Sequence, residues 1–223
     1  WFLRGMLSPS LMCADMLNLQ SEITKLDNLG VDYIHLDFMD GKFVPNVTLD
    51  STIIRAVKNV IKNIKRDIHI MAFEPAQYFD KMNIGKDDIV SVHYEACPNL
   101  HEVIREIRVR GANPFIAISP DTKPDVLKEY LNEIDGIVVM TVYPGFAGQP
   151  IVKGSFEKIA EVRKMIDESS LNIVLEVDGH VSWDLCCKMR ECGADLFVAG
   201  SSSIYQRGIE LEDAVNKMTS LIN

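Results

Sequence analysis

The stretch HLDFMDG, residues 35–41, closes an expected strand over residues 31–38. Successive side chains of a strand point to opposite faces, so His35, Asp37 and Met39 share one face and the apolar residues between them share the other. A strand buried in a parallel sheet normally carries branched apolar residues on both faces. The alternation of an imidazole, a carboxylate and a thioether therefore indicates a strand that contributes to a functional site.

A second expected strand, DIHIM at residues 67–71, repeats part of this pattern, because His69 and Met71 again stand two residues apart. Apolar runs of strand length recur about once every 28 residues, as in a chain of eight strand and helix units. The expected strands cover residues 7–12, 31–38, 67–71, 89–94, 114–119, 136–142, 173–177 and 196–199.

Amphipathic stretches such as residues 16–29 and 156–169 separate these strands, with apolar residues three and four apart as in helices. Regular alternation of strand and helix indicates a parallel sheet. About eight units favour an α/β fold of the (β/α)8 or TIM-barrel type. An open, doubly wound sheet is the alternative that periodicity alone leaves.

Composition limits the function classes. A chain of 223 residues with 47% hydrophobic residues fits one barrel domain over residues 1–223, with residues 1–6 as a native extension or an added segment. A net charge of -9 argues against nucleic-acid or anionic-membrane binding, and no apolar run has the length of a membrane span. Five cysteines without a Cys-x-x-Cys pair favour a reducing cytoplasm. The basic run 58–66 is interpreted as a solvated face.

Polar side chains collect at the ends of several expected strands. His35 and Asp37 end the second strand, His69 ends the third, and Asp178 follows the seventh. The carboxyl ends of barrel strands meet at one mouth, where function resides. Two imidazoles and two carboxylates suit one divalent cation, with zinc favoured and manganese, cobalt, iron or magnesium as alternatives. Hydrogen-bonded polar groups without a metal are the competing interpretation.

Three methionines, Met39, Met71 and Met140, point to the same mouth by the alternation of their strands. Thioethers are polarizable and not basic, so these side chains could wall a reacting centre without exchanging protons with it, although core filling is the ordinary role of methionine. His93, at the end of the fourth strand, is interpreted as a supporting or structural histidine, and His101 as a surface residue on a helix.

Glycine-rich loops follow the last three expected strands: PGFAGQ at residues 144–149, Asp178 with Gly179, and GSSS at residues 200–203. Glycine lets backbone N–H groups approach an anion, and barrels often bind phosphate in the loops around strands seven and eight. Backbone dipoles would reconcile an anionic substrate with an acidic chain. The sequence therefore predicts a phosphate site on this rim.

A metal, two carboxylates and a phosphate site together fit a phosphorylated ketose. A cation would stabilise an enediolate as a Lewis acid, since aspartate is a weak base towards carbon. Asp37 and Asp178, on separate strands, could remove a proton from one face of the sugar and return one to the other. We assign Asp37 as acceptor and Asp178 as donor, and these roles exchange in the reverse direction.

The chain resembles the ribulose-phosphate 3-epimerase family from residue 8 to residue 218. The resemblance rests on SPS at 8–10, HLDFMDG with FVPN at 35–46, DIHIM at 67–71, PGFAGQ at 144–149 and VDG at 177–179. It implies a barrel of the ribulose-phosphate-binding type and a metal held by His35, Asp37, His69 and Asp178. The substrate contacts that it implies are Ser10, His69, Gly145, Phe146, Ala147, Gly148, Ser201, Ser202 and Ser203.

Within that family the sequence is most similar to the allulose-6-phosphate 3-epimerase branch, through SLMC at 10–13, MTV at 140–142 and GSSSIY at 200–205. This similarity predicts conversion of D-allulose 6-phosphate to D-fructose 6-phosphate, with D-ribulose 5-phosphate to D-xylulose 5-phosphate as the alternative. We also expect a homo-oligomer, either a dimer or a hexamer. Tyr143 and His180 depart from the family pattern beside the substrate, and His180 could add a charge to the phosphate site.

Other barrel chemistries fit the sequence less well. A Schiff-base aldolase needs a lysine where Met140 stands, and barrels of the orotidine-decarboxylase type need Asp-x-Lys-x-x-Asp, whose first two positions His35 and Asp37 occupy. A non-catalytic barrel that only binds a sugar phosphate is the alternative from a different class. It would keep the glycine loops and could dispense with both aspartates.

Overall fold

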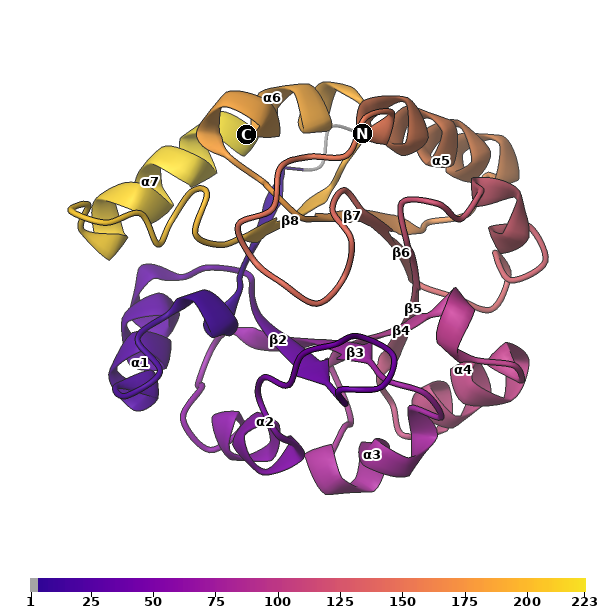
Figure 1. Cartoon of the computed structure of the whole chain (residues 1–223), viewed down its shortest axis with the longest axis horizontal. Coiled ribbons are helices and arrows are strands. Elements are labelled where there is room, and N and C mark those ends of the chain that lie inside the picture. The colour runs from indigo at the N-terminus through magenta and orange to yellow at the C-terminus, as the bar shows by residue number, and fades with distance from the viewer. Residues whose placement is uncertain (1–3) are drawn as a thin grey trace.

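The structure is a computed structural model in which residues 4–223 are described (Figure 1). The strands are β1 (Met6–Pro9), β2 (Tyr33–Met39), β3 (Lys65–Met71), β4 (Ile89–His93), β5 (Asn113–Ile118), β6 (Gly136–Met140), β7 (Val174–Asp178) and β8 (Leu196–Ala199). The α-helices are α1 (Leu19–Leu29), α2 (Ser51–Val57), α3 (Ala76–Met82), α4 (Leu100–Val109), α5 (Ser155–Ser169), α6 (Trp183–Glu191) and α7 (Leu211–Ile222).

The eight strands form one parallel sheet in the order β1-β8-β7-β6-β5-β4-β3-β2. A parallel bridge between Ser10 and His35 joins the two outer strands, so the sheet closes on itself. Figure 1 shows the strands as a central ring and the helices as an outer layer around it. The predicted (β/α)8 barrel is confirmed.

Several element boundaries differ from the sequence-based expectation. Residues after Pro9 turn into a short 3-10 helix, Leu11–Cys13, and do not extend the first strand to residue 12. The connection from β5 to β6 contains a 3-10 helix, Pro124–Leu127, and no α-helix within the described residues. Pro124 stands at the first position of this 3-10 helix, where proline is well tolerated because its missing N–H has no partner to lose.

The sequence predicts an extension over residues 1–6. Residues 1–3 of it lie outside the part of the chain that the structure describes. Met6 opens β1 and pairs with Leu196. Between residues 4 and 223, no helix combines the length and the apolar character needed to cross a membrane. All five cysteines are free.

The barrel interior is layered. Its lower layer is apolar and includes Ile89, Phe115, Val138 and Leu196, all buried. A Cβ on Gly136 would lie 2.3 Å from the ring of Phe115, so the ring fills the space that this glycine leaves. The carboxyl ends of the strands, above this layer, carry the polar side chains. Two buried acids interrupt the apolar layer, because Asp67 is in register with Ile89 and Glu176 with Val138 and Leu196.

The interpretation of the basic run 58–66 as a solvated face is wrong for Arg66. This residue lies in β3 and its side chain is fully buried against Asp88, with Nε 2.9 Å from Asp88 Oδ1. Its guanidinium also donates to the carbonyl oxygens of Ile54, Met82 and Asn83. Burial of this charge is tolerated because every face of the guanidinium has an acceptor. Arg66 therefore ties β3 to the helices outside it.

Candidate active site

Three strands position the polar side chains at the mouth. Asp37 on β2 is in register with His69 on β3, and Met140 on β6 is in register with Asp178 on β7. His35 stands one side-chain repeat below Asp37 on the same face of β2. Because all eight strands run parallel, their carboxyl ends bring these residues to one end of the barrel.

The four side chains converge closely. His35 Nε2 lies 3.3 Å from Asp37 Oδ1 and 3.8 Å from Asp178 Oδ2. His69 Nδ1 lies 3.6 Å from Asp37 Oδ1 and 3.3 Å from Asp178 Oδ2. One ligand atom from each residue lies within 4.8 Å of all the others. The sequence-predicted set is thus brought together at one point.

Two nitrogen atoms at this point lack hydrogen-bond partners among residues 4–223. They are His35 Nε2 and His69 Nδ1, on rings that are fully buried. A buried polar atom without a partner costs free energy unless a ligand supplies the missing interaction. Two such nitrogens beside two carboxylates match the donor set that zinc and similar divalent cations take. The residues present therefore fit a divalent cation.

The charges of the site are set by the proximity of its members. Burial raises the pKa of Asp37, but His35 and His69 lower it by more than burial raises it. The carboxyl group is therefore ionised. Burial lowers the pKa of His35, yet the carboxylates of Asp67 and Asp37 raise it well above its ordinary value. Burial also lowers the pKa of His69, but the nearby carboxylates of Asp178 and Asp37 outweigh this effect and raise it. A cation would replace the protons that these rings otherwise hold.

A buried polar layer supports His35 from below. His35 Nδ1 lies 2.7 Å from Asp67 Oδ2, which also accepts a hydrogen bond from Ser8 Oγ at 2.8 Å. Glu176 is fully buried beside them, and burial together with the Asp67 carboxylate raises its pKa well above the ordinary value. Because Nδ1 contacts Asp67, His35 directs its Nε2 towards the site.

The sequence-based reasoning missed Asp67 and Glu176. Each stands two residues before a predicted ligand, Asp67 before His69 and Glu176 before Asp178, on the same face of its strand. The alternation of side chains along each strand was therefore sufficient to place Asp67 and Glu176 on the same face as the predicted ligands. It was overlooked because both residues lie below the strand ends, where barrels are usually apolar.

His93 lies beside the site, as predicted for a supporting histidine. Its Nε2 is 2.9 Å from His69 Nε2, and its Nδ1 is 3.1 Å from Glu95 Oε2. Burial lowers the pKa of His93, so its ring is neutral.

His101 is half exposed on α4 and contacts Glu129 and Glu133, which confirms the prediction of a surface residue.

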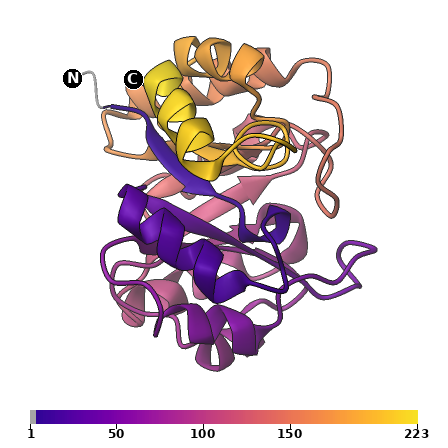
Figure 2. The same ribbon diagram turned by 90° about the vertical axis from the view of Figure 1, so that its left-hand side faces the viewer.

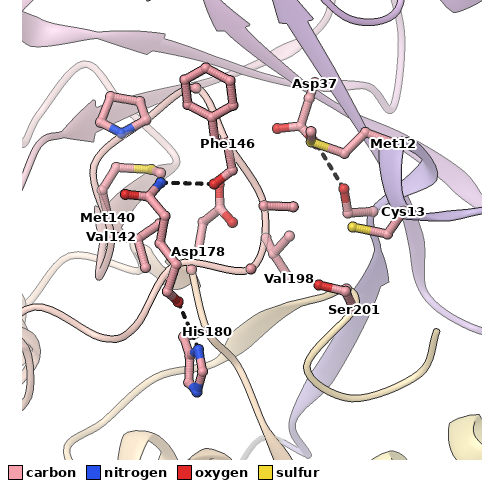
Figure 3. A pocket seen from close by; sticks show the side chains of 18 of the residues that line it. Met12, Cys13, Asp37, Met140, Val142, Phe146, Asp178, His180, Val198 and Ser201 are labelled. Atoms are coloured by element: carbon pink, nitrogen blue, oxygen red, sulfur yellow. Dashed lines mark hydrogen bonds between the residues drawn. The ribbon is translucent and has the colours of Figure 1, made fainter. Parts of the chain in front are cut away.

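A pocket opens directly above the two aspartates (Figure 3). Figure 3 shows Asp37 and Asp178 reaching it from separate walls, with Phe146 between them in this view. Met39, Met71 and Met140 line it, together with Met12, which the sequence-based reasoning did not single out. Most of the predicted substrate contacts line it as well: Ser10, Gly145, Phe146, Ala147, Gly148, Gly179, His180, Ser201 and Ser202.

Two predicted substrate contacts, His69 and Ser203, are not among the residues that line this pocket. His69 is buried beneath the carboxylates of Asp37 and Asp178. The chain after β8 turns tightly, with Ser203 N donating to Gly200 O at 3.1 Å, and this turn leaves Ser203 fully buried. The turn presents Ser201 and Ser202 to the pocket in its place.

Loops after β2 and β6 extend from the same end of the barrel (Figure 2). Asn46 Nδ2 donates to Gly145 O at 2.7 Å, which links the two loops across the mouth. Gln149 Nε2 donates to the carbonyl oxygens of Tyr143 and Phe146, so the second loop folds on itself. His180 Nδ1 lies 2.7 Å from Gln149 O and fixes the loop after β7 to it. These bonds give the pocket a defined rim.

Solved structures with the same fold support the architecture. A structure of KGPDC from Streptococcus mutans superposes with a TM-score of 0.74 at 12% identity, covering 98% of this chain and 97% of that one. A 3-hexulose-6-phosphate synthase superposes with a TM-score of 0.68 at 14% identity, covering 99% of this chain and 100% of that one. At such identities the likeness shows the fold alone.

Sequence relatives are much more similar. A ribulose-phosphate 3-epimerase of Bacillus subtilis is 39% identical over 196 residues, which cover 87% of this chain and 90% of that protein. A ribulose-phosphate 3-epimerase of Synechocystis is 38% identical over 197 residues, which cover 87% of this chain and 85% of that protein. The profile of the ribulose-phosphate 3-epimerase family matches residues 6–205. The chain belongs to the ribulose-phosphate 3-epimerase family.

Proposed function

We propose that the protein is a metal-dependent epimerase that interconverts D-ribulose 5-phosphate and D-xylulose 5-phosphate at C3. The observation that carries this proposal is the placement of Asp37 and Asp178 at one pocket, beside the free nitrogens of His35 and His69. The names of the relatives favour the five-carbon substrate over the allulose 6-phosphate that residues 10–13, 140–142 and 200–205 suggested.

Four side chains would hold the cation: His35 through Nε2, His69 through Nδ1, and Asp37 and Asp178 through carboxylate oxygens. Once bound, a divalent cation supplies Lewis-acid stabilisation of the negative charge that develops on the substrate's C2 and C3 oxygens. Zinc is the favoured ion because its preferred ligands match this mixed nitrogen and oxygen set. Manganese, cobalt, iron and magnesium are the alternatives.

Asp37 and Asp178 carry the proton transfers. Asp37 takes the C3 proton from one face of the sugar, and Asp178 returns a proton to the opposite face, which inverts the configuration. Ser10 Oγ donates to Asp37 Oδ2 at 2.7 Å and leaves Oδ1 directed at the imidazoles, so the carboxylate is held in one orientation. Met39 and Met140 line the pocket beside the two aspartates without offering a competing base.

The phosphate group binds where the loops after β6, β7 and β8 meet. Gly145 has φ 120° and Gly179 has φ 114°, conformations that side chains rarely adopt. A Cβ on Gly179 would also lie 2.6 Å from the Val142 side chain. Both glycines therefore keep the backbone close to the pocket, which Gly179, Ser201 and Ser202 line, and backbone N–H groups of such loops are suited to bind an anion. His180, which is one of the two departures from the family pattern, lines the pocket beside this phosphate site.

The test of the proposed reaction is hydrogen exchange at C3. Ribulose 5-phosphate incubated with the zinc-loaded protein in deuterium oxide should gain deuterium at C3 and equilibrate with xylulose 5-phosphate. NMR spectroscopy of the sugar reports both events. A barrel that only binds sugar phosphate would show neither. Exchange that persists after complete metal removal would refute the metal assignment.

Substrate preference is tested separately, by comparing kcat/KM for ribulose 5-phosphate and allulose 6-phosphate. We expect the five-carbon sugar to be preferred. Tyr143 and His180 both line the pocket, and Tyr143 is tied to Asp121 by a 3.0 Å hydrogen bond, so these side chains restrict the space for a longer sugar. A larger kcat/KM for allulose 6-phosphate would instead assign the protein to the six-carbon branch.

A further inference from the structure

The far side of the His69 ring makes a contact that the proposed reaction does not use. His69 Nδ1 faces Asp178 and Asp37, while its Nε2 lies 2.9 Å from His93 Nε2. The two rings are nearly parallel, with an interplanar angle of 23° and centroids 5.0 Å apart. His93 in turn places Nδ1 3.1 Å from Glu95 Oε2. Three side chains thus form a continuous path from the site to the rim.

Glu95 anchors the outer end of this path. Its Oε1 accepts hydrogen bonds from Ser119 N at 2.8 Å and from the Thr122 hydroxyl, both in the loop after β5. Burial raises the pKa of Glu95, but the hydrogen bonds from His93 and Thr122 lower it to about 2. The carboxyl group is therefore ionised and can only accept hydrogen bonds.

This fixed acceptor determines where the protons of the path lie. Since a carboxylate cannot donate, the hydrogen between His93 and Glu95 belongs to His93 Nδ1. The two facing nitrogens share one hydrogen, and when His69 Nδ1 binds a cation this hydrogen belongs to His69 Nε2, so that His93 Nε2 accepts it. That tautomer leaves a lone pair on His69 Nδ1, the atom that lacks a hydrogen-bond partner in the described chain. The opposite tautomer would place a hydrogen where a cation must bind.

We propose that His93 and Glu95 are positioning residues that fix the tautomer and the ring orientation of His69. The inference rests on the cation site of the proposed function and adds residues that touch neither cation nor substrate. His35 has an equivalent support, because Asp67 contacts its far nitrogen directly at 2.7 Å. Partners of this kind around ligating histidines contribute about 10- to 100-fold to metal affinity.

The test measures the affinity of the protein for zinc by competition with a chelator. Glu95→Ala and His93→Phe should weaken zinc binding by about 10- to 100-fold. Glu95→Gln should weaken it less than Glu95→Ala, since the amide oxygen still accepts from His93 Nδ1. The matched control is Glu133→Gln, which removes a carboxylate bonded to the surface residue His101 at 2.8 Å and should leave zinc affinity unchanged.

A second measurement is independent of how well the variants fold. Nitrogen-15 NMR of the zinc-loaded wild-type protein should show His69 protonated at Nε2 and His93 protonated at Nδ1. A proton on His93 Nε2 would overturn the proposal, as would unchanged zinc affinity in folded Glu95→Ala. If the wild-type protein itself fails to bind zinc, the cation site of the proposed function fails, and the role of His93 and Glu95 fails with it.

Discussion

Replacing either aspartate by asparagine should lower epimerase turnover by about 10³-fold or more, since an amide cannot exchange a proton with carbon and general acid or base catalysis contributes about 10²- to 10⁴-fold. Asp37→Asn and Asp178→Asn change no volume, and Ser10 Oγ can still donate to the amide oxygen at position 37. The fold should therefore persist. Turnover is measured with ribulose 5-phosphate in the zinc-loaded variants.

The two variants should also differ in a way that assigns their roles. With one carboxylate intact, each variant can still remove and return a proton on one face of the sugar. Asp178→Asn should exchange solvent deuterium into C3 of ribulose 5-phosphate only, and Asp37→Asn into C3 of xylulose 5-phosphate only. Exchange into both epimers by either variant would contradict the assignment of one aspartate to each face.

Both aspartates also belong to the proposed cation site, so loss of metal could mimic loss of proton transfer. Zinc content is therefore determined for each variant under assay conditions. The matched control is Asp121→Asn, at the rim of the barrel, where the carboxylate accepts from Tyr143 but does not line the pocket. It should keep turnover within about twofold of the wild type, because the amide oxygen preserves this hydrogen bond.

The barrel and the four converging residues were predictable because both follow from local periods. Alternation of strand and helix implies parallel strands, and parallel strands place their carboxyl ends together. The period of two then assigns His35 and Asp37 to one face of β2. Neither step needs to know which distant segments touch; the eight-stranded parallel sheet confirms the first, and the register of β2 and β3 pairs Asp37 with His69.

Contacts between distant segments were beyond this reasoning. The hydrogen bond from Asn46 to Gly145 spans 99 residues, and no local pattern indicates which loops meet. Arg66 was misread for the same reason, because its acceptors come from α2, the end of α3 and the loop before β4. Glu95 gave no signal either, since the role proposed for it depends on its contact with the His93 ring. The supporting contacts of the site are therefore tertiary in origin.

The affinity of the protein for a divalent cation should rise with pH. In the metal-free fold burial lowers the pKa of His35, but Asp67 and Asp37 raise it well above its ordinary value of about 6.5, and the pKa of His69 is raised as well. Below these values the rings hold protons that a cation must displace. Apparent zinc affinity should therefore fall about 10- to 100-fold for each unit of decreasing pH, for one or two protons displaced.

The free energy of unfolding of the metal-free protein should fall as pH rises, whereas the affinity for the cation increases. A raised pKa in the folded state contributes stability that is fully present below the unfolded pKa of about 6.5 and is lost as pH rises through the folded pKa. The metal-free protein should thus lose stability from His35 and His69 as pH increases. The increase in Tm on adding zinc should grow over the same range, because binding to the folded state strengthens.

Calorimetry in two buffers of different ionisation enthalpy measures the protons released when zinc binds, and chelator competition from roughly pH 6 to roughly pH 8 gives the affinity. The control is His101→Gln. His101 also has a raised pKa, through its hydrogen bonds to Glu129 and Glu133, but it lies on the surface away from the site. Proton release should be the same in this variant as in the wild type. Zinc binding that is independent of pH and releases no protons would contradict the prediction that the cation displaces protons from His35 and His69.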